Sequence, residues 1–139
     1  MKSSTVINQS RIIKISSFVD ERGVLSAIEG KNDIPFEIKR IFTIFDVPEH
    51  ISRGAHAHKE LHQLLICIKG SVEVKLEDGM EIKTYKLNNP LECLHIPPML
   101  WTTTSNFSEG SVLLVLCSDY YYENDYFRDF DKYLLARKK

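Results

Sequence analysis

The sequence has few cysteines and no long apolar run. Its three cysteines, Cys67, Cys93 and Cys117, are widely spaced and each lies in apolar sequence, which argues against a disulfide framework and against a zinc cluster. The longest apolar runs, 64–68 and 112–117, are far too short to span a bilayer, and the N-terminus has no signal-peptide core. We therefore expect a cytoplasmic protein with buried, reduced thiols.

The sequence also has no excess of charge of one sign. Its 18 basic and 19 acidic residues are mixed along the chain, and the formal net charge is -1. Binding to nucleic acid or to a membrane surface is favoured by a field of one sign, so we expect neither partner. A glycine-rich phosphate loop, a nucleophile elbow and an internal repeat are absent as well. A phosphate group could therefore be bound only by a local cluster of basic residues, and not by a charged surface or a glycine-rich loop.

The chain has the length and composition of a single globular domain, which we assign to residues 1–139. It is 43% hydrophobic and 27% charged, which is typical of a protein with an ordinary core. Short β-rich segments follow one another at nearly regular spacing, separated by turns: 11–18, 24–29, 36–45, 53–58, 62–69, 72–77, 82–87, 91–96, 101–106 and 112–117. This spacing predicts an all-β sandwich or barrel.

Two local signals refine this prediction. Asp78-Gly79 separates two alternating segments and is the strongest hairpin signal in the chain. From Asp125 onward, Tyr126, Phe130, Tyr133 and Leu134 have helical spacing, with Asn124 or Asp125 as the N-cap. We therefore predict one C-terminal helix that begins near residue 125.

The segment 53–63 contains the residues with the clearest chemistry. Because side chains alternate along a strand, His56 and His58 should point to the same face while Ala57 points away. Imidazole has an unperturbed pKa near neutrality, so the pair suits either proton transfer or metal binding. The spacing of the pair does not decide between these two functions.

Two motifs around the histidines resemble those of the cupin superfamily of small jelly-roll barrels. The first cupin motif has His-x-His, then a glutamate and a glycine, and here His56 and His58 are followed by Gln63 and Gly70 at the same spacing. The second motif resembles residues 97–106, where Thr102 occupies the position of the third imidazole. An amide and a hydroxyl thus replace two metal ligands, so we expect no tightly bound metal.

A closer resemblance covers most of the chain. It is carried by residues 34–40, Arg53-Gly54-x-His56-x-His58-Lys59, Leu61-His62-Gln63, Gly70-Ser71, 118–121, Asp125-Tyr126 and Arg128. Together these look like the nucleotide-sugar 3,4-ketoisomerases, which are metal-free cupins acting on dTDP-4-keto-6-deoxy-D-glucose in the synthesis of 3-amino-3,6-dideoxyhexoses for bacterial surface glycans. The resemblance implies a jelly-roll barrel, no cofactor, and a homodimer with exchanged N-terminal strands. The hairpin expected near residues 20–23 is compatible with such an exchange.

The resemblance also implies roles for individual residues. In moving the ketone from C4 to C3, a histidine removes the C3 proton and returns a proton at C4 through an enediol; we expect His58 to be the base and His56 its partner. Gln63 is expected to hydrogen-bond the sugar or to hold a histidine tautomer, and Thr102 to contact the substrate. The candidates for the diphosphate and the cavity mouth are basic: Arg53, Arg40, Lys39 and Arg22.

Phe42 is a departure from the resemblance, because relatives often carry a tyrosine there that can join the proton relay. Two alternative functions stay open: a noncatalytic cupin that binds a sugar nucleotide, and a metal-dependent cupin enzyme.

Overall fold

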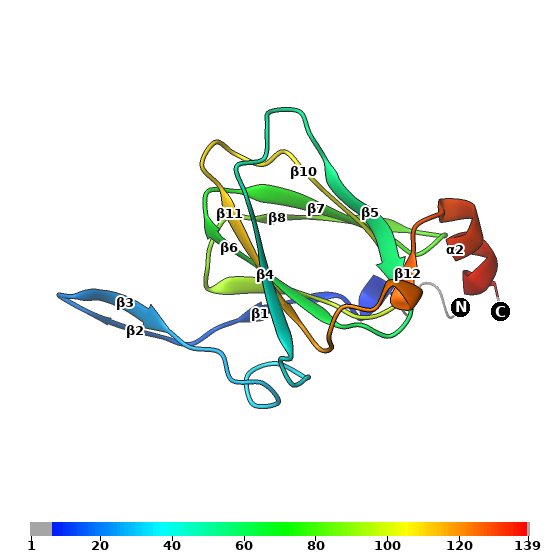
Figure 1. The fold of residues 1–139 in the computed structure, drawn as a ribbon. Helices are drawn as coiled ribbons and strands as arrows, with labels where there is room; N and C mark the ends of the chain where they lie inside the picture. Colours follow the sequence, from blue (N-terminus) through cyan, green and yellow to red (C-terminus); the bar gives the residue numbers. More distant parts are fainter. Residues whose placement is uncertain (1–6, 139) are drawn as a thin grey trace.

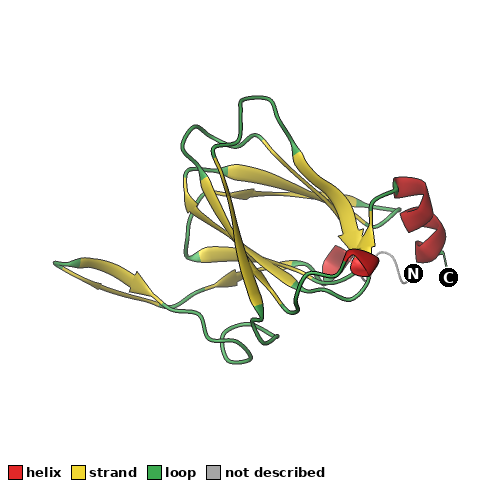
Figure 2. Ribbon diagram, viewed as in Figure 1, coloured by secondary structure: helices red, strands yellow, loops and turns green. Residues whose placement is uncertain are grey.

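The protein consists mainly of two antiparallel β-sheets that face each other, as a computed structural model of the chain shows for residues 7–138 (Figures 1 and 2). The strands of the first sheet are, in spatial order, β1 (Arg11–Lys14), β9 (Glu92–Ile96), β6 (Gln63–Lys69), β11 (Val112–Cys117) and β4 (Arg40–Phe45). Those of the second are β12 (Tyr126–Phe127), β5 (Arg53–His58), β10 (Trp101–Ser105), β7 (Val72–Glu77) and β8 (Ile82–Leu87). The predicted all-β jelly-roll class is confirmed.

The main core lies between the two sheets. In β7, Val72, Val74 and Leu76 are fully buried and alternate with more exposed residues, as the sequence pattern predicts. The turn from β7 to β8 contains Asp78, whose carboxylate accepts hydrogen bonds from the backbone N–H groups of Met80 and Glu81 at 2.9 and 2.8 Å. The predicted hairpin is therefore present, and the three cysteines are buried free thiols.

A separate hairpin, β2 (Ser17–Asp20) and β3 (Gly23–Ser26), projects from the body of the molecule (Figure 1). The single strand predicted over 11–18 is divided, because the chain leaves the first sheet after β1 and enters this hairpin. Phe18 and Val19 are 71% and 72% exposed, and Val24 and Leu25 are also exposed. The hairpin thus presents apolar side chains that the described part of the chain, residues 7–138, leaves exposed.

The strand predicted over 36–45 is wrong over residues 36–39. β4 begins at Arg40, whereas Phe36 lies in a loop that is closed by a hydrogen bond from the Lys31 N–H to the Phe36 carbonyl at 3.0 Å. Phe36 is buried with Ile34 against Leu64 and Leu116, on the outer face of the first sheet. The alternating apolar pattern of this segment therefore reflects packing of a loop and not a continuous strand.

The C-terminal helix is present but starts later than predicted. A short 3₁₀ helix, η1 (Glu123–Asp125), precedes β12, and α2 spans Phe130–Arg137 with Asp129 as its N-cap. Residues 126 and 127 are extended because they pair with His58 and Ala57 of β5. Tyr133 anchors α2 by donating to the carbonyls of Glu77 and Met99, both at 3.0 Å. Among residues 7–138, no helix has the length and apolar character needed to cross a membrane.

Candidate active site

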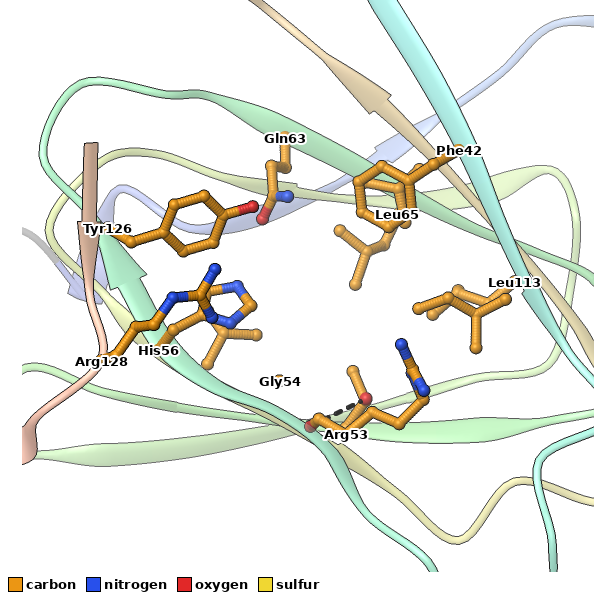
Figure 3. A pocket seen from close by; sticks show the side chains of 13 residues that line it. Phe42, Arg53, Gly54, His56, Gln63, Leu65, Leu113, Tyr126 and Arg128 are labelled. Carbon is orange, nitrogen blue, oxygen red and sulfur yellow. Dashed lines mark hydrogen bonds between the residues drawn. The ribbon is translucent and has the colours of Figure 1, made fainter. Parts of the chain in front are cut away.

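A pocket of about 270 Å³ lies between the two sheets and is lined by four of the eight predicted site residues, His56, Arg53, Gln63 and Thr102. One part of its wall is apolar and the other is polar (Figure 3). The apolar part is formed by Phe42, Ile44, Leu65, Leu113 and Val115, and the polar part by Arg53, Gly54, His56, Gln63, Thr102, Thr104, Tyr126 and Arg128. Such a mixed pocket fits a small ligand that has both apolar and polar groups.

A bulge in β5 brings Arg53 and His56 to the same side. Thr104 is paired with Arg53 and Thr102 with His56, so three residues of β10 oppose four residues of β5. Gly54 has a φ of +90°, and a Cβ there would lie 2.9 Å from the Thr102 carbonyl oxygen. The bulge changes the strand parity, so that residues three apart in sequence both line the pocket.

His56 and His58 lie on the same face of β5, as predicted. Their ring centroids are 5.0 Å apart, and the rings meet edge to face at 80°. His56 lines the pocket, whereas His58 is only 6% exposed and its Nε2 is buried without a hydrogen-bond partner among residues 7–138. The two imidazoles are therefore arranged one behind the other, with His56 facing the space that a ligand would occupy.

Asp125 holds His58 from the side away from the pocket. Its Oδ2 lies 3.0 Å from His58 Nδ1, and its Oδ1 accepts a hydrogen bond from the Glu60 N–H at 2.9 Å. The carboxylate can only accept, so His58 carries its proton on Nδ1 and leaves Nε2 as a lone pair. Asp125 was given no site role from the sequence because it was expected to cap a helix.

Both imidazoles are neutral near pH 7. Burial lowers the pKa of His58, the proximity of His56 lowers it further, and the hydrogen bond with Asp125 opposes the shift without cancelling it. Burial also lowers the pKa of His56, with a smaller contribution from the positive charge of Arg128. A neutral imidazole on a pocket wall can accept a proton, so the site is suited to general base chemistry.

Tyr126 and Arg128 are two further pocket residues without a role in the sequence-based prediction. The Arg128 guanidinium lies 4.0 Å from the centroid of the Tyr126 ring, and Glu123 accepts hydrogen bonds from Arg128 at 2.6 and 3.0 Å. Both residues follow the 3₁₀ helix on an extended segment, where side chains two apart share a face. The alternation over 126–128 could have predicted that Tyr126 and Arg128 share a face. The helical spacing of the longer segment favoured a helix instead.

The predicted substrate-binding residues fall into two groups. Arg53, Gln63 and Thr102 line the pocket together with His56. The other three, Arg40, Lys39 and Arg22, are absent from this pocket wall.

Arg40 does not line the pocket, but it lies beside Phe42, which does. Its guanidinium lies 5.4 and 5.5 Å from the ring centroids of Phe42 and Tyr121. Lys39 Nζ is 4.0 Å from an Asp119 carboxylate oxygen. Arg22 is at the tip of the projecting hairpin, where it pairs with Asp20 at 2.6 Å. Within one chain, Arg22 therefore does not reach the pocket.

The pocket does not contain the ligand set of a cupin metal site. Gln63 presents a neutral amide and Thr102 a hydroxyl beside His56, and the Thr102 hydroxyl donates to the Leu100 carbonyl at 3.3 Å. Divalent transition metals are held by imidazole nitrogens and anionic carboxylates or thiolates, so these donors fit a metal ion poorly.

Comparisons with known proteins agree with this geometry. The sequence model of the FdtA family, described as WxcM-like, C-terminal, matches residues 8–138. The TDP-4-oxo-6-deoxy-alpha-D-glucose-3,4-oxoisomerase of Aneurinibacillus thermoaerophilus is 42% identical over 125 residues, which are 90% of each chain.

Solved structures are similar over nearly the whole chain. QdtA, a sugar 3,4-ketoisomerase of Thermoanaerobacterium thermosaccharolyticum solved with TDP, has a TM-score of 0.91 at 47% identity, covering 93% of this chain and 94% of that one. A variant of QdtA with a histidine replaced by asparagine, solved with TDP-4-keto-6-deoxyglucose, has the same TM-score at 46% identity and the same coverage. A 3,4-ketoisomerase of Helicobacter canadensis has a TM-score of 0.92 at 46% identity, with coverage of 94% and 98%. The chain therefore belongs to the FdtA family, which includes the cupin-fold sugar 3,4-ketoisomerases whose motifs it carries.

Proposed function

We propose that this protein is an isomerase that moves the ketone of dTDP-4-keto-6-deoxy-D-glucose from C4 to C3, within a single cupin domain spanning residues 1–139. The observation that carries the proposal is a neutral His56 on the wall of a mixed pocket, with the His58–Asp125 pair behind it. The names of the relatives support the choice of substrate: one acts on TDP-4-oxo-6-deoxyglucose, and a variant of another was solved with that sugar nucleotide.

His56 is our candidate for the base, which reverses the order expected from the sequence. The buried Nε2 of His58 cannot reach a ligand in the pocket without a rearrangement, whereas His56 faces that space. The C3 proton is acidified by the neighbouring C4 carbonyl, so a neutral imidazole can remove it. The resulting imidazolium then supplies a proton to C4, and the ketone is left at C3.

His58 and Asp125 are positioning residues in this scheme. The Asp125 carboxylate fixes the tautomer of His58, and His58 packs edge to face against His56. When His56 accepts a proton, the positive charge forms close to the Asp125–His58 pair, whose negative charge stabilises it. The Asp125–His58 pair therefore stabilises the protonated form of His56 during the reaction, whereas His56 is neutral in the resting enzyme.

The substrate diphosphate requires cations, and two arginines line the pocket. Arg53 and Arg128 both contribute to its wall, and a guanidinium binds phosphate oxygens with a forked geometry. Gln63 can hydrogen-bond the sugar, because its amide both donates and accepts. Arg40 and Lys39 lie beside Tyr121 and Tyr120, where they can extend the positive surface toward the nucleotide.

A homodimer with exchanged hairpins accounts for the exposed surface of β2 and β3. Phe18, Val19, Val24 and Leu25 are more than half exposed, and β4 is an open edge of the first sheet with Ile41 and Phe45 also exposed. Apolar hairpins and open edges are stabilised when a second strand pairs with them. A hairpin seated on the β4 edge of a partner would bring Arg22 toward the partner's pocket, since β4 also contributes Phe42 to the pocket wall.

The test of the function is an NMR assay of purified protein with dTDP-4-keto-6-deoxy-D-glucose. We expect conversion to the 3-keto isomer, the precursor that an aminotransferase requires to make a 3-amino-3,6-dideoxyhexose. Tight binding of the sugar nucleotide without conversion would instead identify a noncatalytic binding protein. Light scattering tests the dimer separately, and a monomer would contradict the exchanged hairpins.

A further inference from the structure

The proposed keto shift moves hydroxyl protons as well as carbon-bound protons. When the C3 proton leaves, O4 must gain a proton to form the enediol, and O3 must later lose one as the new ketone forms. His56 is occupied with the carbon-bound proton, and Phe42 on the opposite wall has no ionisable group. The pocket must therefore offer a second group that can donate and accept a proton.

The other polar groups of the pocket wall do not serve this purpose. The hydroxyls of Thr102 and Thr104 donate to the carbonyls of Leu100 and Arg53, at 3.3 and 3.1 Å. The amide of Gln63 does not exchange protons as an acid or base, and guanidinium groups stay protonated. Among the residues that line the pocket, this leaves the phenol of Tyr126.

We propose that Tyr126 is a second catalytic residue, whose phenol transfers the proton between O4 and O3 of the substrate; this inference rests on the proposed function. The Tyr126 ring centroid lies 5.1 Å from that of His56 and 4.3 Å from that of His58. Figure 3 shows its hydroxyl directed into the pocket beside the Gln63 amide, with the Phe42 ring on the far side. Tyr126 thus supplies from β12 the phenol that Phe42 lacks on β4.

The position of Tyr126 is fixed by its backbone pairing and by the contact of its ring with Arg128. Its backbone is paired in register with His58, so the tyrosine and the histidine pair are held on adjacent strands. Arg128 covers one face of its ring at 4.0 Å from the centroid, and Glu123 holds Arg128 through two hydrogen bonds. A preorganised donor is what general acid catalysis requires, because no side-chain entropy is lost at the moment of proton transfer.

The step balances without any further reactant. His56 takes the proton from C3, the electrons of the C3–H bond form the C3=C4 double bond, and the carbonyl electrons move to O4, which takes the phenol proton. The Tyr126 phenolate then removes the proton from O3, the O–H electrons form the C3=O bond, and C4 takes the proton from the His56 imidazolium. Both side chains return to their starting states, and nothing is oxidised or reduced overall.

The test compares Tyr126→Phe with the wild type and with Tyr122→Phe. Loss of a general acid lowers turnover by about 10²-fold or more, so we expect kcat of Tyr126→Phe to fall by at least about that factor, with KM little changed. Tyr122 is exposed and does not line this pocket, so Tyr122→Phe should keep the wild-type kcat. Adding Phe42→Tyr to Tyr126→Phe should restore much of the loss, because a phenol then faces the substrate from the opposite wall.

Retained kcat in Tyr126→Phe would overturn the proposal, and so would a loss that Phe42→Tyr does not rescue, since that would indicate a structural role. TDP binding by each variant checks that the fold is kept. If Tyr126→Phe does not fold, fluorotyrosine is introduced at position 126 instead. Its phenol is more acidic, so the fall of kcat at alkaline pH should begin at a lower pH. An unchanged pH profile of kcat would contradict the proposal. Absence of turnover in the wild type would refute the proposed function itself, a result distinct from any of these.

Discussion

Four of the five histidines form two pairs, and the pairs differ in ring geometry and in what surrounds them. His56 and His58 meet edge to face beside a pocket, with a carboxylate behind them. His62 and His95 are stacked at 10° on the outer face of the first sheet, where His62 Nδ1 lies 3.0 Å from His95 Nε2. Comparing the two pairs shows which features of the site come from the imidazoles and which come from the residues around them.

In the outer pair, His62 and His95, the two imidazoles hydrogen-bond to each other. One of its two facing nitrogens donates to the other, so neither is free to act on a ligand. Phe36 packs against both rings, with centroids 5.8 and 6.0 Å away. Burial, with the nearby His62 and Arg11, lowers the pKa of His95 to about 4. Burial lowers the pKa of the histidines in both pairs, so the inner pair differs by its open face and its orienting carboxylate.

The largest expected effect is the loss of the exposed imidazole. His56→Asn removes the group that exchanges the C3 proton, so kcat should fall by about 10³-fold or more. His62→Asn, which alters the outer pair, should keep kcat within about threefold of the wild type. Turnover of the 4-keto sugar nucleotide, followed by NMR, measures both. Equal losses in the two variants would mean that the pairs do not differ in function.

The carboxylate is the next feature to remove. Asp125→Asn keeps the shape of the side chain but can donate to His58 Nδ1, which favours the wrong tautomer and removes the negative charge; kcat should fall by about 10²-fold. Asp131→Asn, in the exposed first turn of α2, is the matched control and should have no effect on kcat. Circular dichroism verifies that both variants are folded. A wild-type rate in Asp125→Asn would contradict a positioning role.

The outer pair should instead appear in the pH dependence of stability. Since the pKa of His95 is lowered from 6.5 to about 4 in the folded state, the unfolded chain binds more protons between these values, and stability falls as pH decreases through this range. His95→Leu should reduce the stability difference between pH 7 and pH 4.5 by about 2 kcal/mol. Urea unfolding at the two pH values measures it, and an unchanged difference would contradict the assignment.

The smallest effect is expected at Thr102. Its hydroxyl faces the pocket wall but already donates to the Leu100 carbonyl, so Thr102→Val should lower kcat/KM by less than about threefold. Steady-state kinetics provides the comparison. A much larger loss would show that the hydroxyl contacts the substrate, as the sequence resemblance implied, and that the polar wall extends beyond the histidine pair.

Local patterns in the sequence were sufficient for much of the fold and for the shared face of His56 and His58. The strand 112–117 agrees with β11 at both ends, because alternation and flanking turns are local signals. Asp125 and Tyr126 were assigned to a helix because their site positions arise from pairing with β5, about 70 residues earlier in the chain. The order of the two histidines depends on the depth of each in the pocket wall, which alternation along a strand does not encode.

The most direct test of the central claim is to run the reaction in deuterated water and to locate the label by NMR. Proton transfer through His56 predicts a 3-keto product in which at least part of the molecules carry solvent deuterium at C4, with that incorporation abolished in His56→Asn and kept in His62→Asn. Formation of the 3-keto product with no deuterium at C4, at the same rate in His56→Asn as in the wild type, would indicate direct hydride migration from C3. That result would contradict the histidine mechanism while leaving the family and the fold unchanged.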